Sequence, residues 1–317
     1  MHGWIILDKP LGLGSTQGVS AVKRALRVGG YGKAKVGHGG TLDPLATGVL
    51  PVAIGEATKL AGRMLDSDKV YDFTIGFGVE TDTLDAEGKA VAESEVRPTL
   101  AEVEAVLPRF TGPIEQVPPA YSALKVDGER AYDLARAGEE VTLATRSVTV
   151  HSLTRHPGLE PGSRFNDVSG NSGIPAQGRD DGRVDAVTLT AHVSKGTYIR
   201  SLARDVARAL GAVGHVTYLR RTKAGPFDLS HAISLDKLAE TANARGLEQI
   251  LLPLRAGLDD IPALSLDPDQ AGALRQGRVL AGIAEDDGLH FAMLGETPVA
   301  LVEIESGEVR VVRGFNL

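Results

Sequence analysis

The sequence predicts a mixed fold, α/β or α+β, built on a large mixed or antiparallel sheet. Segments typical of strands and segments typical of helices follow one another along most of the 317 residues. They do not repeat as strand, helix, strand, helix, so a doubly wound parallel sheet is disfavoured. The chain is long for one typical domain and short for three, which favours two domains.

The strands are predicted from short apolar or alternating runs that end at glycine, proline or polar clusters. Trp4–Leu7, for example, is a buried run that ends at Lys9-Pro10, and in the next long run Tyr71 and Phe73 alternate with polar residues. The predicted strands cover residues 4–7, 35–36, 70–78, 146–155, 184–193 and 213–221.

The helices are predicted from apolar residues at helical spacing and from residues that can cap the first turn. Ser15 or Thr16 can cap the first helix, and Thr197 can cap the fifth. An acid-rich turn at 81–88 interrupts the pattern. The predicted helices cover residues 15–27, 56–65, 100–107, 129–137, 197–210 and 234–245.

Two stretches differ from this pattern. Residues 156–183 are rich in glycine and proline and poor in large apolar residues, which indicates a long surface insertion. Beyond Leu254, the alternation in 298–315 around Ser306-Gly307 is typical of a β-hairpin. We therefore expect residues 1–248 to form the main domain and 249–317 a small β-rich domain.

Composition excludes several classes of site. The chain has no cysteine, so disulfides, iron–sulfur clusters and thiolate nucleophiles are ruled out. The N-terminus lacks the features of a signal peptide, and no apolar stretch approaches membrane-spanning length, so we expect a soluble, cytoplasmic protein. Neither a phosphate loop nor a dinucleotide fingerprint is present. The histidine spacing does not indicate a metal site, and we expect none.

The net charge of −7 is unevenly distributed. Residues 1–69 hold nine Lys/Arg and five acids, a balance of +4, and residues 192–231 hold seven and two, a balance of +5. Either these two segments fold together into one positive face, or they are ordinary scatter of surface charge, and charge alone does not separate the two readings.

A carboxylate on a glycine-rich bend is the first candidate for chemistry. Gly37-His38-Gly39-Gly40 is followed by Thr41-Leu42-Asp43-Pro44. Glycines allow a sharp bend, and the proline keeps Asp43 out of the helical region, so the loop can present this carboxylate to a cleft. Read by itself, the segment is more typical of a structural Asp-Pro turn, because Asp-Pro is common in turns.

The second candidate is Ser194 to Arg200, where a strand ends and a helix begins. A guanidinium in the first helical turn could pair with a carboxylate as a two-pronged fork. Without further information, a structural surface arginine is the simpler reading of Arg200.

Together these segments resemble one family, the bacterial tRNA pseudouridine-55 synthases of the TruB type. The matching segments are short, but they occur in family order between residues 7 and 221. They are Leu7–Gly12, Gly37–Leu50, Lys69–Tyr71, Thr81–Asp85, Pro119–Lys125, Ser194–Arg200 and Tyr218–Arg221. One departure is Gly14, where the family more often has threonine or serine, and the 156–183 insertion is longer than the family pattern.

The resemblance implies roles for individual residues. Asp43 would be the catalytic aspartate, and Arg200 would pair with it and help to keep it ionised in an apolar pocket. Tyr71 would pack against the target nucleotide, and Leu219 would line the wall around the base. His38 would fill space beside the extruded nucleotide.

The resemblance also implies an architecture. Lys9 and Pro10 would support the catalytic loop, and Tyr198 would belong to the substrate-binding set. A thumb-like insertion at about 119–145 would clamp RNA, and 249–317 would be an RNA-binding domain of the PUA type. The expected fold is thus the α+β pseudouridine synthase fold.

The implied reaction is the isomerisation of uridine 55 in the T-loop of transfer RNA. It involves no redox change, so we expect no cofactor, and Asp43 could act either as nucleophile or as base. The expected partner is the T-arm stem-loop of tRNA, with no membrane, no protein partner and a monomeric chain. The absence of basic terminal segments favours a stand-alone enzyme over relatives in guide-RNA particles.

Two alternatives belong to other classes. A non-catalytic RNA-binding or RNA-folding protein would use the same basic face, alone or beside the isomerase activity, and would not depend on Asp43. An aspartate-dependent hydrolase finds little support, because the chain has no paired acid motif and no nucleophile elbow.

Overall fold

The structure is a computed structural model that describes residues 1–122, 124–126, 128–137, 143–156 and 182–317. The predicted insertion at 156–183 therefore lies almost wholly outside the described residues. Part of the predicted thumb-like segment is also outside them.

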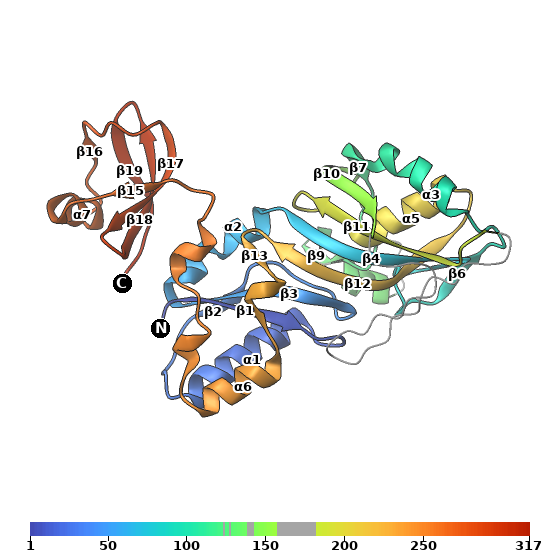
Figure 1. The fold of residues 1–317 in the computed structure, drawn as a ribbon, viewed down its shortest axis with the longest axis horizontal. Coiled ribbons are helices and arrows are strands. Elements are labelled where there is room, and N and C mark those ends of the chain that lie inside the picture. The colour runs from blue at the N-terminus through green and yellow to red at the C-terminus, as the bar shows by residue number, and fades with distance from the viewer. Residues whose placement is uncertain (123, 127, 138–142, 157–181) are drawn as a thin grey trace.

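A ten-stranded mixed sheet forms the centre of the molecule (Figure 1). Its main path runs β14-β1-β3-β12-β4-β11-β10-β7, with β13 paired to β12 and β2 to β3. Only the β1–β14 and β3–β12 pairs are parallel, which confirms the predicted mixed sheet. Its strands are β1 (Gly3–Lys9), β2 (Val36–His38), β3 (Ala46–Ile54), β4 (Lys69–Phe77), β7 (Gly112–Gln116), β10 (Arg146–Arg155), β11 (Ala186–Val193), β12 (Gly214–Ala224), β13 (Phe227–Asp228) and β14 (Ala232–Ile233).

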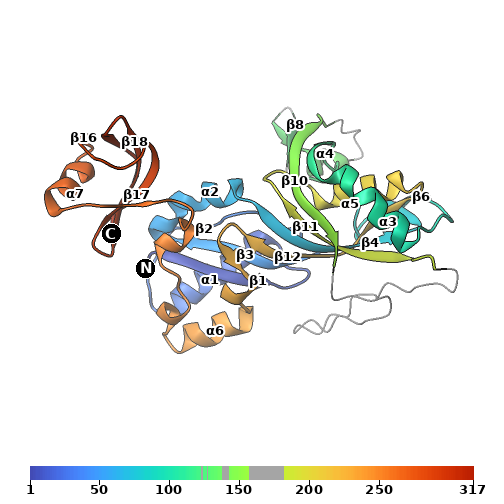
Figure 2. The same ribbon diagram turned by 45° about the horizontal axis from the view of Figure 1, so that its top comes forward.

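One continuous apolar core covers one face of this sheet, and helices cover the core at both ends. Helices α1 and α6 lie side by side near β1 and β3, whereas α3 and α5 cover β4, β11 and β10 (Figures 1 and 2). All nine residues of β3 are buried, because the second face of β1 and β3 is covered as well. The helices of this domain are α1 (Ser15–Val28), α2 (Ala61–Asp66), α3 (Leu100–Val106), α4 (Ala131–Arg136), α5 (Ile199–Ala209) and α6 (Leu235–Asn243).

Short elements complete the domain. Two small hairpins lie outside the main sheet, β5 (Val79–Thr81) with β6 (Ala90–Glu93) and β8 (Lys125–Val126) with β9 (Glu129–Arg130). Single 3-10 turns connect other elements: η1 (Gly55–Leu60), η2 (Leu107–Phe110), η3 (Leu229–His231), η4 (Leu247–Gln249) and η5 (Leu254–Gly257).

Two predicted helix caps are wrong for the same physical reason. Helix α1 is capped at Gly14 rather than by the side chain of Ser15 or Thr16. In α5 the cap position is held by Tyr198, and the Thr197 hydroxyl donates to a preceding strand end instead. In both places a hydroxyl that could cap the helix is used in another contact. The predicted helix at 56–65 is also divided, into η1 and α2.

The C-terminal residues form a separate five-stranded sheet with one helix, α7 (Pro268–Arg275) (Figure 1). The strand order is β15-β17-β18-β19-β16. Ser306 and Gly307 have φ values of 53° and 78°, which is the left-handed pair that a two-residue type I′ hairpin requires. The predicted hairpin is confirmed. The strands are β15 (Ala263–Ser265), β16 (Leu280–Ala281), β17 (Gly288–Leu294), β18 (Thr297–Glu305) and β19 (Glu308–Gly314).

This small sheet packs on the large domain through a shared apolar cluster. The cluster joins Trp4 of β1 and Phe227 of β13 to Phe291 and Phe315 of the C-terminal sheet. Among the described residues, no helix is both long and apolar enough to cross a membrane.

Gly48 provides a test of the sheet geometry. It has a φ of +98°, and a Cβ at this position would lie 2.2 Å from the carbonyl oxygen of Arg221 on the neighbouring strand. We expect Gly48→Ala to lower the free energy of unfolding by at least about 2 kcal/mol. The matched control is Gly37→Ala, because no atom lies within 4 Å of a Cβ there. Urea unfolding of both variants measures the difference, and equal stabilities would contradict the β3–β12 register.

Candidate active site

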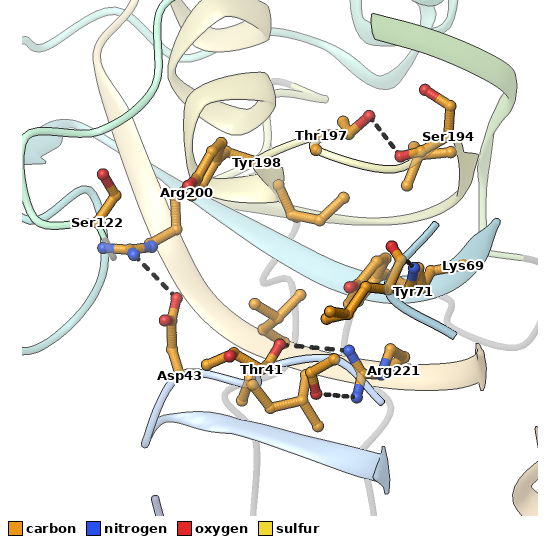
Figure 3. Close-up of a pocket in the computed structure, with 18 residues that line it drawn as sticks. Thr41, Asp43, Lys69, Tyr71, Ser122, Ser194, Thr197, Tyr198, Arg200 and Arg221 are labelled. Carbon is orange, nitrogen blue, oxygen red and sulfur yellow. Dashed lines mark hydrogen bonds and ion pairs between the residues drawn. The ribbon is translucent and has the colours of Figure 1, made fainter. Parts of the chain in front are cut away.

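A cavity of about 310 Å³ opens on the helix-covered face of the sheet, between the start of β3 and the start of α5 (Figure 3). Five of the seven residues proposed from the sequence line it, although they come from four distant segments. These residues are Asp43, Tyr71, Tyr198, Arg200 and Leu219. The long-range convergence that the sequence analysis requires is therefore present.

The loop that carries Asp43 is braced from inside the protein by Arg221 of β12. The Arg221 side chain is buried, and its Nη2 and Nη1 atoms donate to the carbonyls of Gly40 at 3.1 Å and Thr41 at 3.3 Å (Figure 3). Its Nε donates to the carbonyl of Val49 at 2.8 Å. One guanidinium thus fixes the loop to the strand that follows it.

The next part of the loop is held by the segment after β1. The Ser15 hydroxyl donates to the Leu42 carbonyl at 2.9 Å and accepts from the Leu42 amide at 2.8 Å. The Pro44 carbonyl accepts from the Gly12 amide at 2.9 Å and from Lys9 Nζ at 3.2 Å. Because these contacts satisfy the loop backbone, the position of the intervening carboxylate is fixed at its root.

Arg200 connects Asp43 to a second carboxylate. Its Nη2 lies 2.9 Å from Asp43 Oδ2 (Figure 3), and its Nη1 lies 3.3 Å from Asp85 Oδ2. The same two nitrogens donate to the carbonyls of Tyr121 at 2.9 Å and Thr83 at 2.8 Å. The guanidinium is 7% exposed. Its orientation is therefore set by four acceptors that point in different directions.

This arrangement differs from the expected fork between Arg200 and Asp43. The two prongs are divided between Asp43 and Asp85, so Asp43 is contacted through one oxygen. Its side chain is 41% exposed, so the apolar, desolvated surroundings expected for this carboxylate are also absent. A buried cation that touches one oxygen leaves the other oxygen of Asp43 available to a substrate in the cavity.

Tyr198 occupies the cap position of α5, directly before the helix that carries Arg200. The buried Gln116 side chain donates to the Tyr198 carbonyl at 3.1 Å and accepts from its amide at 2.8 Å. Burial raises the pKa of the Tyr198 hydroxyl, so the phenol stays protonated near neutral pH. It can therefore donate a hydrogen bond beside the cavity.

Tyr71 and Leu219 form two walls of the cavity from neighbouring strands. Tyr71 lies on β4 opposite Ala191, and Leu219 lies on β12 opposite Phe73 and Ala46. Both side chains belong to the core face of the sheet, so they present a ring and an apolar branch to the cavity. A flat apolar ligand fits between such surfaces.

Lys9 and His38 do not line the cavity. Lys9 is fully buried behind the loop, where Nζ also donates to the carbonyls of Pro10 and Leu13, and burial lowers its pKa to about 8. These contacts agree with support of the loop rather than contact with substrate. His38 lies half-buried on β2, and burial together with Arg221 lowers its pKa. Its imidazole is therefore neutral at physiological pH.

Three further residues build this site, although no role was predicted for them from the sequence. They are Arg221, Asp85 and Lys69, whose Nζ donates to the carbonyls at the end of α2 and whose pKa burial lowers to about 8. All three lie in segments that match the family. The sequence did carry one signal that could have identified them. Each is a charged residue in or beside an apolar run, and a charged group that becomes buried needs a partner.

The two basic segments fold together, since β12 lies between β3 and β4. However, several of their charges are directed into the protein. Lys9, Lys69, Arg200 and Arg221 are all buried. Much of this positive charge therefore positions the loop and the cavity rather than forming an exposed face.

Comparison with solved structures defines the class of protein. The fold is the pseudouridine synthase fold of the Cbf5 and TruB type. A chain in the structure of an H/ACA RNP bound to a substrate RNA containing 2′-deoxyuridine is 25% identical, with a TM-score of 0.69, over 99% of this chain and 85% of that one. A chain of a Cbf5–Nop10–Gar1 complex has the same fold, with a TM-score of 0.69, 24% identity and coverage of 99% and 84%.

The chain belongs to the TruB family of pseudouridylate synthases. Residues 27–199 match the N-terminal domain of that family, and residues 200–259 match the C-terminal domain of tRNA pseudouridylate synthase B. The tRNA pseudouridine synthase B of Novosphingobium aromaticivorans is 64% identical over all of this chain and 98% of its own length. The protein of the same name from Zymomonas mobilis is 59% identical over all of this chain and 96% of its own length.

Replacement of Arg200 tests whether its simultaneous contacts with Asp43 and Asp85 are needed for the reaction. A lysine keeps the charge, but one ammonium cannot reach both carboxylates and both carbonyls. We expect Arg200→Lys to lower single-turnover pseudouridine formation about 100-fold, comparable to the loss of an oriented electrostatic donor. Arg208→Lys is the control on the same helix, since Arg208 pairs with Glu80 and is mostly exposed. Equal rates in the two variants would show that orientation by Arg200 is unimportant.

The lowered pKa of Lys9 predicts a pH dependence of stability. A folded pKa of about 8 against an ordinary value of 10.5 means that the folded state binds fewer protons between these limits. Burial of Lys9 therefore carries no protonation penalty above pH 10.5, where the lysine is neutral in both states. The folded state loses stability as the pH falls from 10.5 through about 8, because the unfolded chain takes up the proton first. From pH 7 to 9.5, wild type should gain about 2 kcal/mol relative to Lys9→Met. Denaturant unfolding at both pH values measures this gain, and parallel stability curves would contradict it.

Proposed function

We propose that the protein isomerises uridine to pseudouridine at position 55 in the T-loop of tRNA, with Asp43 as the catalytic carboxylate. The single observation that carries this proposal is the ion pair between Asp43 and buried Arg200 at the edge of a cavity walled by Tyr71 and Leu219. The names of the relatives, tRNA pseudouridine synthase B, support the choice of substrate.

The reaction breaks the bond between C1′ of the ribose and N1 of the base, turns the base, and joins C1′ to C5. A carboxylate near the sugar assists as a nucleophile at C1′ or as a base toward the ribose. One Asp43 oxygen pairs with Arg200, which leaves the other to face the substrate. This geometry serves both mechanisms, and neither requires a redox step or a cofactor.

The target nucleotide must leave its stack to reach Asp43. Extrusion costs a few kcal/mol, and contacts to the flipped base offset part of it. Tyr71 supplies an aromatic surface and Leu219 an apolar one, while the Tyr198 hydroxyl can donate to a polar atom of the nucleotide. We propose that His38, which lies outside this cavity, contacts the emptied RNA loop rather than the base.

The remaining RNA contacts are proposed from the domain organisation. We assign residues 1–248 to catalysis and 249–317 to an RNA-binding domain of the PUA type, supported by the separate five-stranded sheet. The thumb-like insertion at about 119–145 is proposed to clamp the T-arm. Its described part adjoins the site, since the Tyr121 carbonyl accepts from Arg200.

Asp43→Asn tests the proposed catalytic role. The amide preserves shape but supplies no negative charge, so pseudouridine formation should fall at least about 1,000-fold while tRNA binding stays within about threefold. The measurement is chemical mapping of pseudouridine at single-nucleotide resolution on unmodified tRNA, with filter binding in parallel.

Asp66→Asn is the matched control, because Asp66 is an exposed aspartate near the cavity that pairs with Lys195. Full activity of Asp43→Asn would show that the reaction uses another group, whereas tRNA binding without pseudouridine formation by the wild type would show an RNA-binding protein. Modification away from position 55 would overturn the substrate and retain the reaction.

A further inference from the structure

Two histidines and one aspartate meet on the sheet face opposite the cavity. Asp68 lies directly before β4, His151 on β10 and His192 on β11. The Nε2 atoms of His151 and His192 lie 3.1 Å and 3.7 Å from the same oxygen, Oδ2 of Asp68. The two imidazole rings are 4.7 Å apart between centroids. None of the three residues belongs to the proposed catalytic machinery.

The strand register explains how the two imidazoles come to share one face. Strand β10 pairs Val150 with Val193 and Ser152 with His192, so His151 is the extra residue of a β-bulge. The bulge reverses the alternation of buried and exposed residues along β10, and His151 and Ser152 are both exposed. Val148 and Val150 are buried, so alternation along β10 already directs His151 to the exposed face, which is also the face of His192 on β11.

The separations are compatible with a metal-ligand set, since one ligand atom from each of the three residues lies within 4.8 Å of the other two. Ligand atoms bound at 2.0–2.1 Å in a tetrahedral site lie about 3.3 Å from each other. The two measured separations, 3.1 Å and 3.7 Å, lie on either side of this value. The separation between His192 and Asp68 is too long for a hydrogen bond, so the carboxylate alone does not account for the orientation of that ring.

We propose that Asp68, His151 and His192 bind one divalent transition-metal ion of the zinc class. Two neutral imidazoles and one carboxylate suit zinc, cobalt or iron, whereas magnesium and calcium prefer oxygen ligands alone. The three side chains are between 37% and 48% exposed, so an ion can enter from solvent and water can complete its coordination. The sequence analysis predicted no metal site, because the ligands come from three separate segments.

The location gives the ion a structural consequence. Lys69 and Val193 follow Asp68 and His192 in the chain and line the catalytic cavity from the other side of the sheet. An ion held by all three ligands would tie the start of β4 to β10 and the end of β11. It would thus fix the strand ends that form one wall of the cavity, without contacting the substrate.

The test is titration of the full-length, untagged protein with Zn²⁺ by isothermal calorimetry, with Co²⁺ absorption spectroscopy as a report on coordination. We expect one ion per chain and a cobalt spectrum typical of nitrogen and oxygen ligands. His151→Ala and His192→Ala should each weaken Zn²⁺ binding at least about tenfold. Both histidines are at least partly exposed, so circular dichroism should show an unchanged fold.

The matched control is His231→Ala. His231 and Asp228 form another exposed pair at 3.0 Å, with no second imidazole on that carboxylate within the described part of the chain. Its Zn²⁺ affinity should equal that of wild type, and excess Mg²⁺ should not compete. Absence of a one-to-one binding event, or equal affinity in the His151, His192 and His231 variants, would overturn the proposal.

Discussion

The site depends on the backbone of residues 40–44, in which every carbonyl has a hydrogen-bond donor. The carbonyls of Gly40 and Thr41 accept from Arg221, and the third accepts from the Ser15 hydroxyl. The carbonyl of Asp43 accepts from the Ala46 amide, and the carbonyl of Pro44 accepts from the Gly12 amide and from Lys9. A loop without regular structure is thereby fixed along its length, because each of its carbonyls has a donor within the protein. The Asp43 carboxylate can point into the cavity without a structural contact of its own, other than Arg200.

Local sequence signals predicted most of the longer strands and helices, although not β3, β17 or α7, since strands and helices follow from alternation and helical spacing. The mixed sheet, the C-terminal hairpin and the loop with Asp43 were all predictable in this way. The caps at Ser15 and Thr197 were not, because each hydroxyl can cap a helix or bond elsewhere, and only the tertiary fold decides. Arg221 was missed for a related reason. Its brace depends on the parallel pairing of β12 with β3, a contact between distant segments.

The distribution of positive charge shows why composition alone was ambiguous. The two basic segments adjoin in the fold, as one of the two readings required. Several of their cations are nonetheless buried, where they satisfy carbonyls and carboxylates. Burial of a lysine or arginine is costly unless it has such partners, so these groups specify one arrangement of the loop. Charge counts along a sequence therefore overstate the charge available to a polyanionic ligand.

The apolar cluster around Trp4 has a consequence for how the whole chain unfolds. The ring centroids of Trp4 and Phe227 in the large domain are 5.4 Å apart, and both rings belong to one apolar cluster with Phe291 and Phe315 of the C-terminal residues. A cluster shared in this way couples the two sheets energetically, so heat should melt them in one cooperative transition. Removal of the C-terminal sheet would expose an apolar aromatic surface on the rest of the chain, and the shortened protein would tend to aggregate.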